Sequence, residues 1–498
     1  MATPATGPGT GVQGDDRGRA AARPASEGAG TVPGAAAAPG AGTAASGPAP
    51  AGAGEGRGSR GLLAAGALVA AVAAAAYVAA LATHPWTSVL NGFDLQVYLG
   101  GAHEALHHAG SLYSWHYRGD LGIQFTYTPF AALLFAGALA LPFRALMALV
   151  TVASVLSLFA AVAIAFRELG WRPLATRIGA ALLVTGLALW TEPVQRALYL
   201  GQVELVLMAL VVWDMCQPDR RRWKGAGVGL AAGIKLVPLL FIVYLLLTRR
   251  LRAAAVAIAA FAATVVIGFA ALPHPSVTWW LRLNFLQAGR TGFVGDQQNQ
   301  SLRGLLTRLA GSVSSGQGPW LAAAVLVGLL GLAAAVLLHR SGRSWGPFAG
   351  LMAAALTALL VSPISWDHHW VWIAPGLVLL IDAGVRLARA TPAGGGAAGP
   401  GRARLGAACW LGLAGLVLLA YGGWPDFWWP HAGLLQGGLI NYAPAAVFAH
   451  GDNPAYPEYH WHGLQLIAGN LYLLGGLGLF LVTLAVAGWL VRNRRRAS

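Results

Sequence analysis

Apolar stretches of roughly 20 residues recur along this chain, and they constrain its fold more than any other feature. A helix of that length crosses about 30 Å of hydrocarbon. The composition agrees, because 56% of the 498 residues are hydrophobic and only 10% are charged. The first stretch, 61–83, carries no charge and follows a segment far longer than the basic start of a signal peptide, so we expect it to be retained. The sequence therefore predicts an all-α polytopic membrane protein.

The predicted protein has about 12 transmembrane helices and helices in the extracytoplasmic loops. The segment 225–248 is ambiguous, since it holds Lys235 and Pro238 in its middle and has basic residues at both ends. That pattern fits two half-helices that enter the membrane and return. The other predicted spans lie near 61–83, 126–142, 145–166, 177–191, 200–214, 253–272, 319–338, 346–361, 371–388, 405–421 and 466–491.

Basic residues cluster between the spans, which is typical of cytoplasmic loops. We expect both termini to be cytoplasmic in a multi-pass protein of the cell membrane, with anionic lipids as partners rather than nucleic acid, despite the net charge of +15. One conflict remains, because a simple count of spans places Arg167, Arg172 and Arg177 outside.

Composition also predicts the domains. Residues 1–59 are mostly small and polar and should form a disordered cytoplasmic tail, and the membrane domain should occupy 60–491. Within it we expect a flexible cytoplasmic linker at 391–403 and an aromatic-rich extracytoplasmic loop at 422–465, and 492–498 should form a basic cytoplasmic tail. Neither a disulfide framework nor a thiolate metal site is indicated by the two cysteines.

Asp94 lies about ten residues after the first span and begins an amphipathic pattern that predicts a helix on the membrane surface. Its buried face would hold Leu95, Val97, Tyr98, Ala102, Ala105 and Leu106. Asp94 is either a catalytic carboxylate or the cap of this helix, and the two roles are compatible. His103 and His107 have the spacing of a ligand pair, but a solvated helix face explains them better.

Three further places hold candidate phosphate-binding groups. Lys235 would be costly in an apolar segment unless paired, although it could also reach the cytoplasmic surface. Arg303 has the forked geometry that suits a phosphodiester, or it is an ordinary interfacial arginine, and Arg290 is a weaker candidate. The run Asp367-His368-His369 could contact phosphate or sugar, serve only at the interface, or hold a metal, which is the least favoured option. The chain has no Asp-x-Asp pair, so a lipid monophosphate donor is more attractive than a nucleotide sugar bound through a metal.

An ordered set of motifs resembles glycosyltransferase family 87, the polyprenyl-phosphate-mannose-dependent α-1,2-mannosyltransferases of the GT-C membrane fold. The resemblance covers roughly residues 61 to 390, and Glu204 stands where the family more often has Asn. The motifs, in chain order, are Asp94-Leu95-Gln96-Val97-Tyr98, Leu112-Tyr113, Phe125-Thr126-Tyr127-Thr128-Pro129-Phe130, Gly201-Gln202-Val203-Glu204-Leu205, Gly233-Ile234-Lys235-Leu236-Val237-Pro238, Asn299-Gln300-Ser301-Leu302-Arg303-Gly304 and Ser362-Pro363-Ile364-Ser365-Trp366-Asp367-His368-His369.

The resemblance implies inverting transfer of mannose from a polyprenyl-phosphate donor to a lipid or glycan hydroxyl on the extracytoplasmic side. Phosphate leaves readily, so one base suffices, and the family's aspartate after the first span maps onto Asp94. No cofactor and no divalent metal is expected, and the acceptor and the choice of mannose or arabinose stay open. The alternatives are a transporter or flippase for a lipid-linked or anionic solute, or a non-catalytic assembly factor. The expected donor-binding residues are Lys235, Arg303, His368, His369, Asn299, Gln300 and Tyr127, and those near the acceptor or supporting the site are Tyr98, Gln202, Glu204, Asp367 and Trp366.

Overall fold

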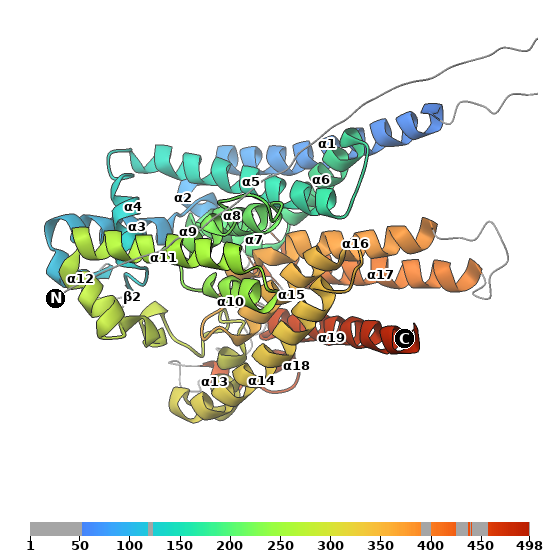
Figure 1. Ribbon diagram of the computed structural model, residues 1–498. Coiled ribbons are helices and arrows are strands. Elements are labelled where there is room, and N and C mark those ends of the chain that lie inside the picture. The colour runs from blue at the N-terminus through green and yellow to red at the C-terminus, as the bar shows by residue number, and fades with distance from the viewer. Residues whose placement is uncertain are drawn as a thin grey trace, which may run out of the picture. The chain divides into compact units, whose positions relative to one another are not determined.

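The computed structural model describes residues 52–117, 123–389, 400–424, 437–438, 440 and 457–497. The chain divides into two compact units, 1–51 and 52–498, and everything below concerns the second. Its described residues are mostly helical (Figure 1). Three predicted segments lie largely outside the described residues, namely most of the tail at 1–59, most of the linker at 391–403 and most of the aromatic-rich loop at 422–465.

Seven helical segments in the described residues are long and apolar enough to cross a membrane. A bent pair, α7 (Glu192–Leu200) and α8 (Glu204–Met215), gives an eighth candidate if it is counted as one span, with an angle of 115° between its halves. Two further apolar helices, α6 (Leu174–Ala188) and α15 (Gly346–Val361), are shorter than 18 residues. The described residues thus hold seven or eight candidate spans, fewer than the 12 that the sequence predicts. The long segments contain α1 (Gly52–Thr83), α5 (Phe143–Glu168), α11 (Leu251–Ala271), α14 (Val313–His339), α16 (Ile373–Arg389), α17 (Pro400–Ala420) and α19 (Leu471–Ala497).

The predicted span at 126–142 is wrong. Its place is taken by α4 (Pro129–Ala136), which has eight residues and a length of only about 12 Å. The hydroxyl of Thr128 begins the helix by accepting a hydrogen bond from the backbone N–H of Ala131 at 3.1 Å. With this crossing removed, α5 brings Arg167 to the other basic loops, where its guanidinium donates to the carbonyl of Cys216 at 3.4 Å. Without this crossing, the count of spans no longer places these arginines outside.

The segment 225–248 folds back on itself, so that its first and last residues lie at the same end of the helical domain, as the sequence predicts. It consists of α9 (Ala226–Ile234) and α10 (Leu239–Leu247), which are too short to cross. Lys224 before α9 and Arg250 after α10 both contact the same oxygen of Asp219, at 2.8 and 3.5 Å. The break between the two helices therefore lies deep in the molecule and carries Lys235 at its tip.

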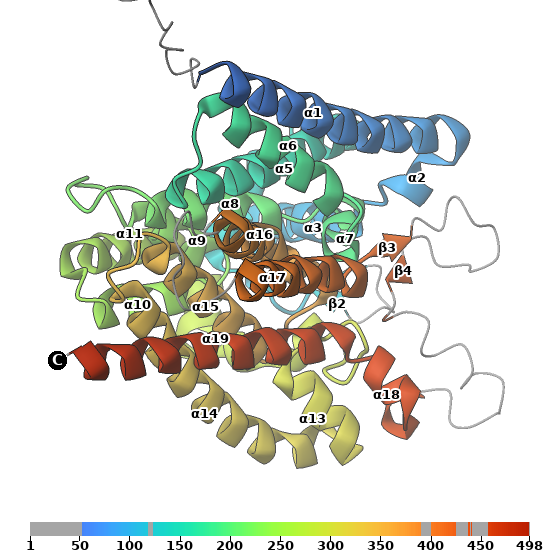
Figure 2. The same ribbon diagram turned by 90° about the vertical axis from the view of Figure 1, so that its right-hand side faces the viewer.

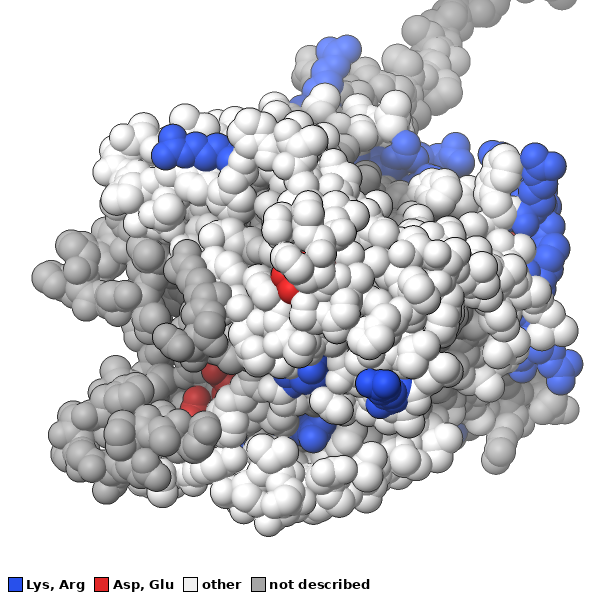
Figure 3. Space-filling view, turned by 90° about the vertical axis from the view of Figure 1, so that its left-hand side faces the viewer, with Lys and Arg blue, Asp and Glu red and all other residues white. Residues whose placement is uncertain are grey.

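The surface helix after the first span is α3 (Phe93–His107), and it buries the predicted apolar face except for Leu106, which is 54% exposed. Figure 3 shows the face of the molecule on the side of α3 and α12, where most side chains are uncharged. Figure 2 shows the start of α1 and the end of α19 on one side of the fold, with α2 and α18 on the other. The small elements are α2 (Trp86–Val89), η1 (Ala109–Ser111), the antiparallel pairs β1 (His116–Tyr117) with β2 (Ile123–Gln124) and β3 (Gly423–Trp424) with β4 (Gly437–Gly438), α12 (Pro273–Ser276), η2 (Val277–Leu281), η3 (Asn284–Leu286), η4 (Ala288–Thr291), α13 (Leu302–Ala310), η5 (Asp367–Trp372), η9 (Pro457–His460) and α18 (Leu464–Ala468).

Two buried apolar clusters hold these helices together. The larger joins α1 and α3 to α11, and the smaller packs α13, α15, α16, α17 and α19 around Trp370, Tyr421 and Tyr472. Small residues allow some helices to approach closely, since a Cβ added at Gly179 would lie 2.6 Å from the backbone of Leu63. The predicted domain edges move slightly, because α1 already begins at Gly52, α17 begins at Pro400 and α19 continues to Ala497.

Candidate active site

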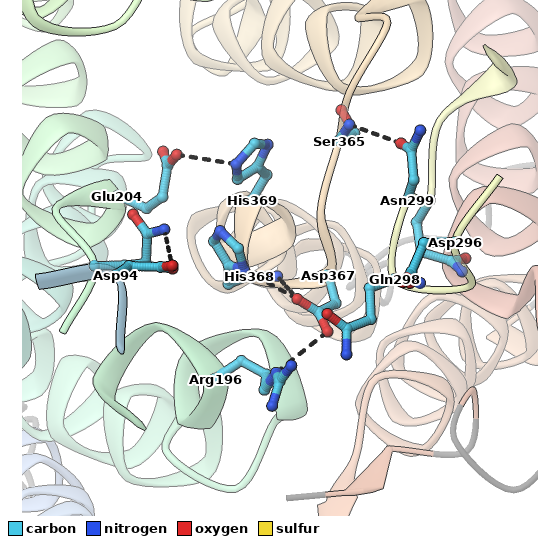
Figure 4. Close-up of polar contacts among 12 residues, drawn as sticks. Asp94, Arg196, Glu204, Asp296, Gln298, Asn299, Ser365, Asp367, His368 and His369 are labelled. Carbon is cyan, nitrogen blue, oxygen red and sulfur yellow. Dashed lines mark hydrogen bonds and ion pairs between the residues drawn. The ribbon is translucent and has the colours of Figure 1, made fainter. Parts of the chain in front are cut away.

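The amide of Gln202 binds the carboxylate of Asp94, its Nε2 donating to Oδ2 at 2.5 Å (Figure 4). Asp94 stands in the first turn of α3, but the cap position belongs to Gly92 and no side chain caps the helix. The capping alternative is therefore wrong. Within the described part of the chain, no residue is found hydrogen-bonded to Oδ1 of Asp94.

Two glycines with left-handed backbone bring Asp94 and Gln202 together. Gly92 has φ of 65° and donates its N–H to the carbonyl of Tyr199 at 2.7 Å, which ties α3 to α7. Gly201 has φ of 68° at the bend between α7 and α8, and an added Cβ there would lie 2.9 Å from Cβ of Leu95. Since L side chains rarely adopt this conformation, these positions favour glycine.

Two tyrosines fix the orientation of the Gln202 amide. Tyr98 donates to Oε1 of Gln202 at 2.5 Å, the Tyr127 hydroxyl lies 3.4 Å from the same oxygen, and the two hydroxyls are 2.8 Å apart. Burial raises the pKa of both tyrosines, so the hydroxyls stay protonated and can donate. With Oε1 occupied in this way, Nε2 is turned towards Asp94.

Opposing influences act on the Asp94 carboxylate. Burial raises its pKa above the ordinary value, while His368, the hydrogen bond from Gln202, Arg196 and Lys235 each lower it in part. These groups come from four different elements and converge on one carboxylate. The net result is a base whose pKa is raised, which is the direction that makes a carboxylate a stronger proton acceptor.

Lys235 lies within a small polar group that faces apolar side chains. Its Nζ donates to Oε1 of Glu204 and lies 3.0 Å from Nε2 of His369, which is itself 3.3 Å from that oxygen. The ammonium also lies 5.5 Å from the centre of the Tyr127 ring. The alternative in which Lys235 reaches the cytoplasmic surface is therefore wrong. The cavity beside this group is narrow, about 30 Å³, and is otherwise lined by apolar residues such as Trp372.

His368 lies between Asp94 and Asp367 in Figure 4. Its Nδ1 is 3.0 Å from Oδ1 of Asp367, and this contact orients the ring. The opposite nitrogen, Nε2, is buried and has no hydrogen-bond partner among the described residues. A buried nitrogen of this kind is a natural place for a substrate oxygen.

The sequence analysis missed two residues of this site. Arg196, on α7, places its Nε 3.4 Å from Oδ2 of Asp367. Its signal was a lone arginine inside an apolar segment between spans. Asp296 caps its own loop by accepting the N–H of Gln298 at 2.7 Å, and burial raises its pKa to about 6. The negative charge of Asp367 adds to this rise in the pKa of Asp296.

Asn299 joins two loops, and its amide is occupied by backbone groups. Its Nδ2 donates to the carbonyl of Val294 at 2.8 Å, and its Oδ1 accepts the N–H of Ser365 at 3.0 Å. A backbone bridge pairs Asn299 with Trp366. The residue is 0% exposed, so the geometry favours a structural role, and direct donor contact stays a prediction.

Gln300 is equally buried, at 0% exposure. Its Oε1 accepts the N–H groups of Tyr472 and Leu473 at 3.2 and 3.3 Å, and its Nε2 donates to the carbonyl of Gly469 at 2.8 Å. This amide therefore anchors the start of α19. Donor binding by Gln300 also stays a prediction.

The remaining arginine candidates lie against aromatic rings. Arg303 stacks on Trp320 of α14 with its Cζ 4.9 Å from the ring centre, and no contact between it and Asp94 or His368 is found in the described residues. Arg290 donates to the carbonyl of Tyr113 at 2.5 Å. Both remain predictions as phosphate ligands. In the described segments, no group of three or more His, Cys, Asp or Glu residues lies close enough to hold a metal ion.

The arrangement combines the Asp94 carboxylate, whose Oδ1 has no hydrogen-bond partner among the described residues, with Lys235, Arg196 and the imidazole of His368, which come from three elements. The carboxylate could accept a proton, while Lys235, Arg196 and His368 could stabilise negative charge on a leaving group.

Comparison with known proteins gives consistent matches. The model of glycosyltransferase family 87 matches residues 125–363, a region that ends just before Asp367 and begins after Asp94. A polyprenol-phosphate-mannose-dependent alpha-(1-2)-phosphatidylinositol pentamannoside mannosyltransferase of Mycobacterium tuberculosis (strain CDC 1551 / Oshkosh) is 34% identical over 392 residues, which cover 77% of this chain and 80% of the relative. A polyprenol-phosphate-mannose-dependent alpha-(1-2)-phosphatidylinositol mannoside mannosyltransferase of Mycobacterium tuberculosis (strain ATCC 25618 / H37Rv) is 31% identical, over 70% of this chain and 84% of the relative. No solved structure gives a significant match.

The helical membrane fold and these matches define a membrane-embedded glycosyltransferase. More specifically, the chain belongs to glycosyltransferase family 87.

Proposed function

We propose that this enzyme transfers mannose from a polyprenyl-phosphate donor to a hydroxyl of a lipid or glycan acceptor, with Asp94 as the general base. The observation that carries the proposal is the Asp94 carboxylate itself. Gln202 holds one of its oxygens, and no described residue is hydrogen-bonded to the other. The relatives are named for the same donor and for phosphatidylinositol mannosides, so a mannosylated phosphoinositide is the acceptor class we favour.

Asp94 takes the proton of the attacking hydroxyl through Oδ1. Gln202 supports this role because it restrains the carboxylate without protonating it, and Tyr98 keeps the amide in the required orientation. The acceptor oxygen then bonds to the anomeric carbon as the bond from that carbon to the phosphate oxygen breaks. A single displacement of this kind inverts the configuration at the carbon.

The leaving phosphate gains negative charge and needs positive neighbours. His368 offers its free Nε2, with Asp367 holding the opposite nitrogen, and Lys235 and Arg196 add charge nearby. Lys235 uses two of its three N–H donors on Glu204 and His369. The third donor is available to the phosphate. Because the phosphate is a good leaving group, the proposal includes neither a metal nor another cofactor.

We place this site on the extracytoplasmic side. Met147 near the start of α5 lies against Gly201, whereas Arg167 at the end of the same helix lies among the basic loops. Twenty residues of helix separate these two positions by about 30 Å, the thickness of the hydrocarbon layer. If the basic loops are cytoplasmic, Asp94 faces outwards.

The test uses the purified full chain in lipid vesicles with labelled polyprenyl-phosphate-mannose and a phosphatidylinositol mannoside. We expect a mannosylated lipid product with the α configuration, determined by NMR from a β-linked donor. Retention of configuration would contradict the single displacement. Absence of transfer to this and to other glycan acceptors, together with movement of labelled donor across the vesicle membrane, would favour the transporter alternative.

A further inference from the structure

A second cavity, of about 550 Å³, lies at the end of the helices opposite Asp94. It is formed by the end of α5, the loop that follows α8, the end of α10 and the start of α15. We call it the basic cavity, after the Arg167, Arg221, Lys224 and Arg250 side chains in its lining. Its volume lies within the range of small-molecule sites, and neither the donor nor the acceptor chemistry described above uses it.

The lining of the basic cavity carries more positive than negative charge. Its two acids are Asp219, which contacts Lys224 at 2.8 Å and Arg250 at 3.5 Å, and Glu168, which contacts Arg167 at 3.0 Å. Four cations thus face two carboxylates that are already paired. Burial and the nearby charge of Arg250 lower the pKa of Lys224, which shows that the cations here repel one another.

One polar atom in the lining is left unsatisfied. Tyr244 is completely buried, and its hydroxyl has no hydrogen-bond partner among the described residues. Buried polar atoms are nearly always paired, so an unpaired hydroxyl beside a cavity points to a ligand oxygen.

The opposite wall is apolar, since Met215, Phe348 and Leu351 are buried there. A site for an anion beside an apolar wall, at the end of membrane helices, suits an amphiphile whose head group carries a phosphate. We propose that the basic cavity binds the phosphate group of an anionic phospholipid. Soluble phosphate shares the recognised chemistry, but it would leave the apolar wall uncovered.

The test uses the purified full chain in nanodiscs of phosphatidylcholine with added phosphatidylglycerol, and native mass spectrometry to measure the lipid retained. Wild type should retain phosphatidylglycerol in preference to phosphatidylcholine. Arg221→Gln, at an exposed position, should weaken this binding roughly tenfold through the loss of one charge-assisted contact. Tyr244→Phe removes a single oxygen and should weaken it about threefold. The matched control is Arg343→Gln, which removes a charge at an exposed position outside the cavity lining and should change nothing.

A second arm adds inorganic phosphate without phosphatidylglycerol and follows the thermal midpoint. Stabilisation that is lost in Arg221→Gln and Tyr244→Phe would support the site and identify the phosphate group alone as sufficient. Retention of phosphatidylglycerol without any effect of inorganic phosphate would support the lipid head group. The proposal is overturned if neither ligand binds, or if the two cavity variants and Arg343→Gln bind alike.

Discussion

Two buried polar clusters in this enzyme differ in how far their polar side-chain atoms are hydrogen-bonded. Around Asn299 and Gln300 the amide groups are occupied by backbone partners, and Arg308 adds bonds to the carbonyls of Asp296 and Asn299. Around Asp94 the supporting groups are also bonded, yet Oδ1 of Asp94 and Nε2 of His368 remain open. Both clusters come from motifs typical of the family. We therefore expect Asp94 and His368 to contact substrate through these open atoms, and we expect the occupied amides of Asn299 and Gln300 to stabilise the fold.

Asp94→Asn should have the largest effect on activity and tests most strongly whether the Asp94 cluster differs from the Asn299–Gln300 cluster. The amide cannot accept the acceptor proton, so we expect the transfer rate to fall by about 10²–10⁴ with an unchanged thermal midpoint. The measurement is initial-rate transfer from labelled polyprenyl-phosphate-mannose. Glu104→Gln is the matched control, since it makes the same change on the same helix and should leave the rate unaltered. Equal transfer rates for wild type and Asp94→Asn would contradict the assignment of Asp94 as the general base.

His368→Gln should have the next largest effect on activity. It removes the imidazole that Asp367 orients, and losing one hydrogen bond to a charged oxygen predicts a fall in kcat/KM of roughly 10- to 100-fold. His103→Gln on the exposed part of α3 serves as the control. An unchanged kcat/KM would show that His368, like Asn299 and Gln300, stabilises the fold and does not contact substrate.

Gln300→Ala should reduce stability but leave catalysis largely unchanged. It leaves two backbone N–H groups of α19 without a partner, so we expect a loss of about 2–3 kcal/mol in the free energy of unfolding. Turnover per folded molecule should stay near that of wild type. The checks are the thermal midpoint in detergent and the rate normalised to folded protein. A wild-type midpoint with a raised donor KM would instead make Gln300 a donor ligand.

Tyr127→Phe should have the smallest effect. Its hydroxyl lies 3.4 Å from Oε1 of Gln202, while Tyr98 keeps the closer contact of 2.5 Å. We expect kcat to fall by about two- to fivefold, as measured at saturating donor. Tyr98→Phe should cost more, and a reversed order would show that Tyr127 contacts substrate directly.

The sequence anticipated parts of the site that depend on local patterns. Asp94 after the first span, the amphipathic α3 and the break at Lys235 follow from hydropathy and from the family motifs. Arg196 was missed because its role depends on a contact with Asp367, which lies far away along the chain. Asp296 was missed because its raised pKa results from burial in the folded protein. The span at 126–142 failed for a related reason, since hydropathy reports apolar length and cannot show that the helix ends at Ala136.

The structural role of Asn299 and Gln300 was equally hidden. A motif identifies polar residues, but only the fold shows that Ser365 and the start of α19 occupy their amides. Conversely, the free oxygen of Asp94 could not be inferred, because it depends on Gln202 approaching from the bend between α7 and α8.

The pH dependence of kcat/KM tests the role of Asp94 most directly. Asp94 must be ionised to act as a base, so kcat/KM should fall as the pH drops through the pKa of Asp94. Because burial raises this pKa, the acidic limb of the pH profile should lie at a higher pH than for an ordinary aspartate. The hydrogen bond from Gln202 lowers the pKa, so Gln202→Met should move the limb to higher pH, whereas Gln287→Met should not. Asp296→Asn, which removes another carboxyl whose pKa is raised by burial, should leave this part of the pH profile in place. A limb that moves with Asp296→Asn and ignores Gln202→Met would contradict the assignment of Asp94 as the base.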